Sequence, residues 1–552
     1  MNVETLIIGS GVAATTIAQS LLERDPAASI LMLDAGRRVK TKDFAVWENY
    51  LVTGRLPYEN CRDLDYPDRD YAGENSRAAR TPVTLQGARL FAYGGSTLHW
   101  GGWAFRLKPE DFELRSRTGN GADWPISYAQ LERYYCRAEE YLAVSGDSGD
   151  RTVPRSMEYP FRAFPFTLQD EPLAAAFDKL AIAYGNLPIA RRGVSKTPSR
   201  HAPCQTTGTC KYCPFGARYV ASDYLDDLRT WNDYPNLDIR LGIVVDRINT
   251  SSKSKAVSID FFEPATRSAG TIEAQRIIVA AGAIESANLL LRSRSNDWPS
   301  GLGNVSDALG RNFVTHPYFI FSGTMPSNPE RLQPEMNFPT LVSRFYDSVD
   351  QQRLGKFILV NPPDAFSVNV TGLMQAGRAR SDIEAYITGS VRVQLHGMVE
   401  VFSQSSNRVA PLSKRNRFGV PQTRVEYTPE VSFDARMAQI KVNVQEIFAA
   451  MGAELTDDAS VSWRADHAGC TCRMSSSDTE GVVDENLKVH GLNNLFLCSN
   501  AVFPSIGAVN PTLTLTALAI RLGDYLSGSG YRESDDARSR QVDTSKVAPN
   551  GA

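Results

Sequence analysis

The sequence predicts an α/β protein in which a Rossmann-like nucleotide-binding domain is joined to an α+β domain built on an antiparallel sheet. Three patterns indicate this architecture. The chain opens with a strand, a glycine turn, a helix and a second strand; apolar residues alternate with period two over residues 391–395; and residues 433–451 show apolar positions at helical spacing. Sheet and amphipathic helix are therefore expected side by side in the second domain.

The opening unit carries the most specific local pattern. Residues 5–8 and 30–33 are apolar, strand-like runs, and residues 12–23 between them have helical periodicity. A Gly-x-Gly-x-x-Ala turn before the helix lets N–H groups approach a pyrophosphate, and an acid after the second strand can bind ribose hydroxyls. We therefore expect a dinucleotide here, the alternative being a structural βα turn. The residues concerned are Gly9, Gly11, Ala14 and Asp34.

Further elements follow along the chain. Residues 124–144 are expected to contain a helix capped by Ser127. Two strand-like runs, 277–281 and 495–497, each lead into a turn of small residues and then a helix, as cofactor-facing parts of a doubly wound sheet do. After residue 526 the chain becomes polar and is expected to form a disordered tail.

Composition excludes several classes of protein. At 552 residues the chain is long enough for two domains, and 59 Lys plus Arg against 62 Asp plus Glu give a net charge of -3. With no long basic run, a nucleic-acid partner is not expected. No stretch of about 20 apolar residues is present to enter a membrane, and no export signal marks the N-terminus. We expect a cytoplasmic protein, although one exported together with a partner would look the same.

The choice between FAD and NAD depends on a later segment, because both bind the same fingerprint. Residues 87–102 are rich in glycine and also contain Arg89, His99 and Trp100. So many glycines indicate a backbone that lies close to a large planar group. A purely structural loop would not need those three side chains at such close spacing.

This segment resembles the flavin-contacting signature of the glucose–methanol–choline (GMC) oxidoreductases. Residues 281–287 resemble the second signature of that family, and residues 301–317 the segment after it. The similarity is strongest with the branch of pyranose oxidases, glycoside 3-oxidases and bacterial sugar dehydrogenases. Only residues from about 326 to 460 contain no motif that resembles the family. The similarity implies the GMC fold and FAD as cofactor, bound through Gly9, Gly11, Ala14, Asp34, Arg89, Gly94, Gly95, Ser96, His99, Trp100, Gly101, Ala281, Asn500, Ala501, Pro511 and Thr512.

The same resemblance implies that the domains interleave along the chain. The FAD-binding domain is expected at residues 1–110, 201–317 and 456–526, the substrate domain at 111–200 and 318–455, and the polar tail at 527–552.

Alcohol oxidation needs a base for the hydroxyl proton, a donor to the nascent carbonyl oxygen and a hydride acceptor, here flavin N5. His467 and Asn510 match the His/Asn catalytic pair of the family, so the resemblance makes His467 the base and Asn510 the group that orients the hydroxyl. A lone histidine is otherwise more often a satisfied structural residue, which is our expectation for His201, His396 and His490. Pro511 is expected to begin a helix whose positive end faces the flavin.

His99 resembles the histidine that pyranose oxidases link covalently to the flavin 8α-methyl group. Related sugar dehydrogenases keep a similar His-Trp pair without certain covalency. The alternative is a histidine that packs against the isoalloxazine edge.

Three of the eight cysteines form a close run, with five residues between Cys204 and Cys210 and two between Cys210 and Cys213. The spacing is typical of iron–sulfur ligands, and it resembles the cluster segment of bacterial membrane-linked sugar dehydrogenases, although one cysteine of a double Cys is absent. Three ligands would suit a three-iron cluster. The alternative is a reduced cysteine-rich loop near the cofactor.

We therefore expect FAD-dependent oxidation of a secondary alcohol of a sugar or glycoside to a ketone. The flavin would be reoxidised by O2 or another acceptor, and a partner subunit for electron transfer or export stays open. A redox-neutral lyase on the same fold, oxidation of a non-sugar alcohol and a non-catalytic flavin subunit are the alternatives.

Overall fold

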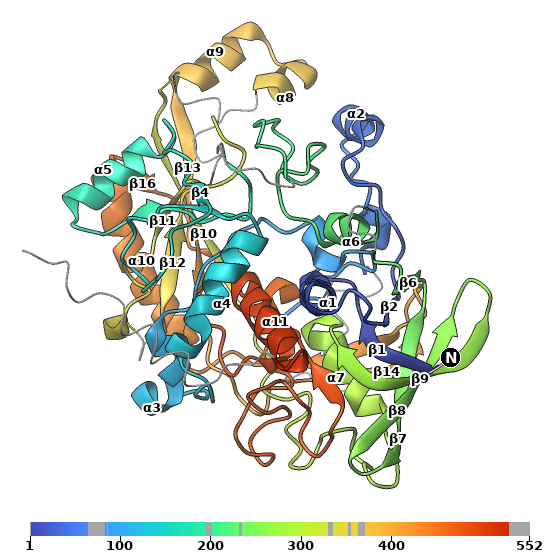
Figure 1. Ribbon diagram of the computed structural model, residues 1–552. Helices are drawn as coiled ribbons and strands as arrows, with labels where there is room; N and C mark the ends of the chain where they lie inside the picture. The colour runs from blue at the N-terminus through green and yellow to red at the C-terminus, as the bar shows by residue number, and fades with distance from the viewer. Residues whose placement is uncertain are drawn as a thin grey trace, which may run out of the picture.

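The structure, a computed structural model, describes residues 2–63, 83–85, 87–193, 201–230, 234–328, 330, 335–351, 355–362 and 370–528. The tail expected at 527–552 lies outside these residues from 529 onward. Two seven-stranded sheets occupy opposite sides of the molecule, with helices between and around them (Figure 1). The predicted pairing of a Rossmann-like domain with a domain on a second sheet is confirmed.

The first sheet has the order β6-β2-β1-β9-β8-β7. Its central strand β1 (Asn2–Ile8) pairs in parallel with β2 (Ile30–Asp34) and β9 (Ser268–Val279). The last three residues of β9 also pair in parallel with β18 (Leu495–Leu497), while its first half pairs with the antiparallel β8. The described part of β1 is almost wholly buried, and a strand covered on both faces is expected to be a continuous apolar run. The other strands are β6 (Leu237–Leu241), β7 (Val244–Ser252) and β8 (Lys255–Glu263).

Three helices near this sheet bring distant parts of the chain together. Helix α1 (Val12–Arg24) packs against α11 (Thr512–Leu526), and α11 packs in turn against α4 (Tyr128–Tyr141). Ser127 caps α4 as expected: its hydroxyl accepts from the Gln130 N–H, and the Gln130 side chain accepts from the Ser127 N–H at 2.8 Å. A fourth helix, α7 (Gly282–Arg292), packs on β7. Helices near the start and near the end of the described chain, α1 and α11, therefore pack side by side next to the first sheet.

The second sheet has the order β16-β10-β13-β12-β11-β5, with β17 also paired to β10. Its long strands β10 (Tyr318–Pro326) and β13 (Ser390–Val399) are antiparallel, and alternate side chains such as Phe319 and Val393 are buried. These side chains pack on α5 (Glu171–Lys179) and α10 (Phe433–Met451), so the predicted switch from period two to helical period is confirmed. The shorter strands are β5 (Gly185–Asn186), β11 (Leu341–Ser343), β12 (Phe357–Val360), β16 (Glu454–Leu455) and β17 (Ser460–Ser462).

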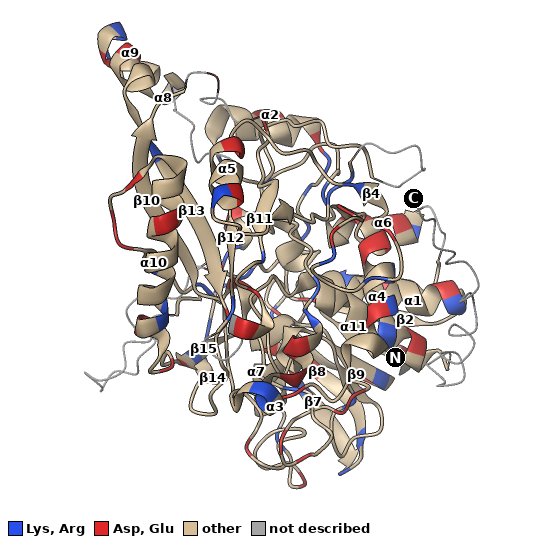
Figure 2. Cartoon of the chain, turned by 90° about the vertical axis from the view of Figure 1, so that its left-hand side faces the viewer, with Lys and Arg blue, Asp and Glu red and all other residues tan. Residues whose placement is uncertain are grey.

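The remaining elements are short. They are α2 (Phe44–Thr53), α3 (Leu114–Thr118), α6 (Ala221–Thr230), α8 (Val370–Gln375), α9 (Arg380–Thr388), β3 (Ser145–Gly146), β4 (Phe161–Arg162), β14 (Arg408–Arg415) and β15 (Pro421–Glu426). In the described part of the chain, none of the helices has both the length and the hydropathy needed to cross a membrane. Figure 2 shows that acidic and basic residues are interspersed along the chain.

The passage from one sheet to the other is relevant to the site. The chain enters the second sheet at Tyr318, two residues after His316, and leaves it again after β17 at Ser462. Strand β17 thus belongs to the second sheet although it lies beyond residue 455. His316 and His467 both lie just outside this sheet, one before and one after it.

Candidate active site

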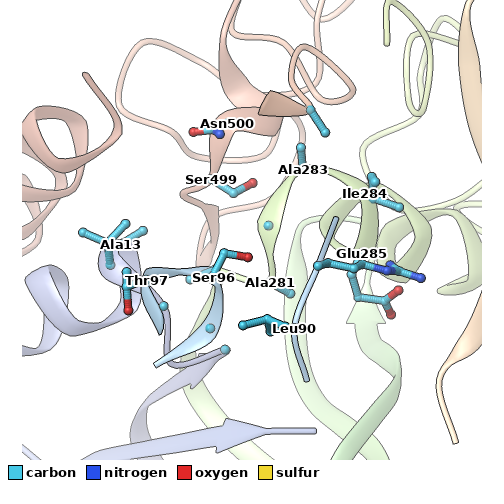
Figure 3. Close-up of a pocket in the computed structure, with 18 of the residues that line it drawn as sticks. Ala13, Leu90, Ser96, Thr97, Ala281, Ala283, Ile284, Glu285, Ser499 and Asn500 are labelled. Atoms are coloured by element: carbon cyan, nitrogen blue, oxygen red, sulfur yellow. The ribbon is translucent and has the colours of Figure 1, made fainter. Parts of the chain in front are cut away.

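A cavity of about 630 Å³ lies where the parallel strands of the first sheet end. Figure 3 shows that separate segments line it: Ala13 from α1, Ser96 and Thr97 from the glycine-rich segment, Ala281 and Glu285 around the start of α7, and Ser499 and Asn500 after β18. Fifteen residues predicted from the sequence line this cavity, namely Gly9, Gly11, Asp34, Arg89, Gly95, Ser96, His99, Trp100, Gly101, Ala281, His467, Asn500, Asn510, Pro511 and Thr512. Ala14 and Ala501, which are fully buried, and Gly94 do not line it.

The glycine turn before α1 is shaped to hold a phosphate group. Gly9 has a φ of +108°, and a Cβ there would lie 2.4 Å from the carbonyl oxygen of Ala280, so only glycine fits. A Cβ on Gly11 would meet no protein atom within 4 Å, although Gly11 lines the cavity. Gly11 is the N-cap of α1 and no side chain caps this helix, so its first N–H groups are available to an anion.

Asp34 is fixed by two neighbours at the end of β2. Its carboxylate accepts from the hydroxyl of Ser10 and from the backbone N–H of Gly36, each at 2.6 Å. Burial raises the pKa of Asp34, against the opposing effect of these hydrogen bonds. Ser10 also accepts from the N–H of Gly94 at 3.0 Å, so Gly94 joins the glycine-rich segment to the nucleotide turn. Each carboxylate oxygen retains a lone pair for ribose hydroxyls.

The opposite end of the cavity meets a second helix terminus. Pro511 is the N-cap of α11, no side chain caps this helix, and both Pro511 and Thr512 line the cavity. In the described part of the chain, Oδ1 of Asn500 and Oδ1 of Asn510 are buried without a hydrogen-bond partner. The positive end of the helix suits the pyrimidine edge of a flavin, which becomes negative on reduction, and the two free amide oxygens can accept from an N–H group at that edge. With the phosphate cradle and Asp34, the residues present fit FAD.

Glu285, within the segment 281–287, also lines the cavity and was not predicted as a site residue. Its Oε1 accepts from Arg292 at 2.5 Å, while Oε2 is buried without a partner among the described residues. This oxygen can accept a hydrogen bond from the bound nucleotide. An acidic residue in the first turn of a helix that follows a buried strand could have indicated a cofactor contact. Nothing in the sequence, however, shows where this side chain points.

His467 and Asn510 meet at the cavity although 43 residues separate them. His467 ends the 3₁₀ turn Ala465–His467, Asn510 precedes α11, and Asn510 Nδ2 lies 3.0 Å from His467 Nε2. Burial lowers the pKa of His467 to about 4, so its imidazole is neutral at neutral pH. A neutral imidazole that reaches the cavity can accept a proton.

A second histidine touches the first. His316 Nδ1 lies 3.0 Å from His467 Nδ1, and His316 Nε2 lies 2.8 Å from the carbonyl oxygen of Gly507. Burial, with a smaller effect of His467, lowers the pKa of His316 to about 3. Nothing in the sequence indicates that these two imidazoles touch, because 151 residues separate them.

His99 lies on the wall of the cavity, edge-on to Tyr58 with ring centroids 6.3 Å apart. Burial lowers its pKa to about 4, so the ring is neutral. The position is compatible with either of the two roles expected for His99.

The cysteine loop, defined as Cys204, Cys210 and Cys213 with the residues between them, lies outside the cavity lining except for Lys211. Arg191 Nη1 donates to the sulfur of Cys210 at 3.0 Å and to that of Cys204 at 3.7 Å, while the sulfur of Cys213 accepts from the N–H of Ala217 at 3.4 Å. Within the described ranges, no group of three or more His, Cys, Asp or Glu residues is arranged to hold a metal ion. The conformation described thus does not present the three thiols as a cluster site, and the iron–sulfur centre stays a prediction.

Comparisons with known proteins find relatives that match nearly the whole chain. Fructose dehydrogenase large subunit of Gluconobacter japonicus is 27% identical over 95% of this chain and 98% of its own length. Paromamine 6'-oxidase of Streptomyces fradiae is 25% identical over 95% of this chain and 91% of its own, and C-glycoside 3-oxidase of Microbacterium trichothecenolyticum is 25% identical over 94% and 95%.

Solved structures share the fold. The crystal structure of pyridoxine 4-oxidase from Mesorbium loti superposes with a TM-score of 0.63 at 19% identity, covering 96% of this chain and 100% of that one. GMC oxidoreductase family models match residues 3–318 and 403–519. The chain therefore belongs to the GMC oxidoreductase family and is an FAD-dependent enzyme that acts on CH–OH groups.

Proposed function

We propose that the enzyme oxidises a secondary alcohol of a sugar or glycoside to a ketone, with His467 as the base. The observation that carries this proposal is the contact between His467 and Asn510 at the wall of the FAD-sized cavity. Three relatives, named for the oxidation of fructose, paromamine and a C-glycoside, support a sugar or glycoside as the substrate. A fourth, 2-methyl-1,2-propanediol dehydrogenase of Mycolicibacterium austroafricanum, 24% identical over 99% of this chain, favours a non-sugar alcohol as the second candidate.

The reaction uses the pair as follows. FAD, when bound, supplies the acceptor for the hydride that leaves the alcohol carbon. A substrate hydroxyl that enters between Asn510 Nδ2 and His467 Nε2 receives a hydrogen bond from the amide and gives its proton to the imidazole. The carbon loses a hydride and the oxygen loses a proton, which leaves a ketone. The N-terminus of α11 favours negative charge at the same place.

Anaerobic mixing with a panel of sugars, glycosides and simple alcohols tests this proposal. Bleaching of the flavin absorbance together with formation of a ketone is expected for at least one sugar or glycoside. Bleaching by simple alcohols alone would assign the non-sugar activity. Product without bleaching would show a lyase, and neither signal with any compound would contradict an enzymatic role on these substrates.

The route of the electrons after reduction is a separate proposal. We propose that O2 or another acceptor takes the electrons from the reduced flavin. A partner subunit is supported by the Gluconobacter relative, which is named as a large subunit. Reoxidation of reduced enzyme by air, compared with reoxidation by an artificial one-electron acceptor, distinguishes an oxidase from a dehydrogenase.

A covalent bond from His99 to the flavin stays a proposal, supported by the position of the ring on the cavity wall.

An iron–sulfur cluster in the cysteine loop also stays a proposal, supported by the positively charged side chains around the loop. Arg191 and Arg218 are each 3% exposed. Arg191 donates to cysteine sulfur atoms, and Arg218 donates to the carbonyls of Leu98 and Trp100. Buried cations call for negative charge nearby, which an iron–sulfur cluster held by these cysteines would supply.

A further inference from the structure

Three hydrogen bonds form one continuous chain through the site. The carbonyl oxygen of Gly507 lies 2.8 Å from His316 Nε2, His316 Nδ1 lies 3.0 Å from His467 Nδ1, and His467 Nε2 lies 3.0 Å from Asn510 Nδ2. Both nitrogen atoms of both imidazoles are therefore engaged. The two rings stand nearly perpendicular, at 84°, with centroids 5.2 Å apart.

The chemistry of these atoms decides where each proton sits. A carbonyl oxygen can only accept, so His316 Nε2 carries the proton that it donates to Gly507. A neutral His316 then has a bare Nδ1, and the short contact requires His467 Nδ1 to be the donor. A neutral His467 is left with a bare Nε2, the atom that faces Asn510 at the cavity. The bare nitrogen is the one that a general base needs on that side.

The charges near the pair do not disturb this assignment. His316 is 4% exposed, and among the described residues His467 is the ionisable group that acts on it. Burial alone shifts His467, and the neighbouring charges Arg464 and Asp466 pair with each other at 2.9 Å. Two imidazolium ions 3.0 Å apart would repel each other, so at most one ring of the pair carries a charge.

The anchor of the chain is itself held in place. Gly507 has a φ of +56°, and a Cβ there would lie 2.8 Å from Leu107 and 3.3 Å from the carboxyl group of Asp111. The hydroxyl of Ser505, two residues earlier, donates to the backbone carbonyl of Asp111 at 3.1 Å. Asp111 in turn pairs with the buried Lys356 at 2.5 Å. The loop that presents the Gly507 carbonyl thus packs on the segment from Leu107 to Asp111.

We propose that His316 is a positioning residue that holds His467 in the tautomer with a bare Nε2 and stabilises the imidazolium formed when His467 takes the substrate proton. The inference rests on the proposed role of His467 as base. After proton transfer His467 still donates from Nδ1 to the bare Nδ1 of His316, so the hydrogen bond becomes charge-assisted and stronger. The acceptor is a neutral imidazole, where a serine hydrolase has a carboxylate. A neutral acceptor orients the base and raises its proton affinity less than a carboxylate would.

Three substitutions of His316 separate orientation from mere packing. His316→Phe keeps an aromatic ring but removes the acceptor, so flavin reduction should slow by about 10²–10⁴-fold, up to the full loss of the base. His316→Asn restores an acceptor oxygen and should recover about 10- to 100-fold of that loss, as for one hydrogen bond to an ionising group. His316→Asp puts a carboxylate beside His467 and should move the acidic limb of the reduction rate upward by about 1–3 pH units.

The readouts are FAD content and the rate of anaerobic flavin reduction from pH 4 to pH 9. His490→Asn is the matched control, because His490 also bonds a backbone carbonyl, that of Ser475 at 3.1 Å, but lies away from the cavity. It should leave both rate and pH profile unchanged. If His316→Phe does not retain FAD, the pH profile of His316→Asp decides alone.

An unshifted acidic limb in His316→Asp, or a normal rate in His316→Phe with full FAD content, would overturn the positioning role. Measuring His467→Ala in the same series separates the two claims. If that variant is slow while the His316 variants behave as wild type, only the present inference is lost. If His467→Ala also reduces at the wild-type rate, the proposed base is wrong.

Discussion

Replacing His467 and Asn510 by alanine, singly and together, measures whether the two groups act as one unit. His467→Ala removes the base and should slow flavin reduction by about 10²–10⁴-fold. Asn510→Ala removes one oriented donor and should slow it on the order of 10²-fold or more. Independent effects would multiply to about 10⁴–10⁶-fold in the double variant.

The structure predicts a smaller combined loss. The two nitrogen atoms lie 3.0 Å apart, so both groups act on one hydroxyl and removing either misplaces it for the other. The double variant should therefore be little slower than His467→Ala alone. Among the described residues, the side-chain hydrogen bonds of the pair are those to each other and to His316, so FAD content should be close to that of the wild type.

Anaerobic stopped-flow reduction, with FAD content from the absorbance ratio, provides the four rates. A multiplicative loss would refute the idea of a single unit. If His467→Ala instead loses flavin while its residual holoenzyme reduces normally, His467 is structural and His316 is the first base to test.

The other predictions concern the cofactors and pH. The purified protein should be yellow, and Gly11→Val should lower its FAD content, because the added side chain enters the phosphate cradle; a colourless protein that binds NAD would contradict the site. Since burial holds the pKa of His467 near 4, flavin reduction should stay constant from neutral pH to about pH 5 and fall below it as the imidazole takes a proton; a fall already at pH 7 would count against this base. If His99 is bonded to the flavin, acid precipitation should leave flavin absorbance in the pellet and His99→Ala should release it, whereas flavin wholly in the supernatant would favour simple packing. Iron analysis of anaerobically purified protein should find about three iron atoms per chain if the cysteine loop holds a cluster, and replacing its three cysteines should abolish them; iron-free protein would remove that proposal.

Much of the first domain could be predicted because its signals are local. The strand, glycine turn and helix at the N-terminus are encoded by neighbouring residues, and Ser127 and Gln130 form a capping box within one helical turn. The short strands of the second sheet were not predicted. Strands such as β5 and β11 have two and three residues, too few to show a period. They form because a neighbouring strand provides an edge: β11 pairs with β12, and β5 pairs with β11.

The site shows the same division. His467 and Asn510 were assigned through resemblance to a family, and the structure brings them together. The contacts of His316 were not predictable, because its partners His467 and Gly507 lie 151 and 191 residues away and no spacing rule connects them. His201 and His490 do bond backbone carbonyls, those of Gly216 and Ser475, as expected of structural histidines.

The most direct test of the central claim is the anaerobic reduction of enzyme-bound flavin by a panel of sugars and glycosides. The proposed function predicts that at least one of them bleaches the flavin and yields one ketone for each flavin reduced, and that His467→Ala slows this bleaching by about 10²–10⁴-fold without loss of FAD. A holoenzyme whose flavin stays oxidised with every sugar and glycoside, or a His467→Ala variant that is bleached at the wild-type rate, would contradict it.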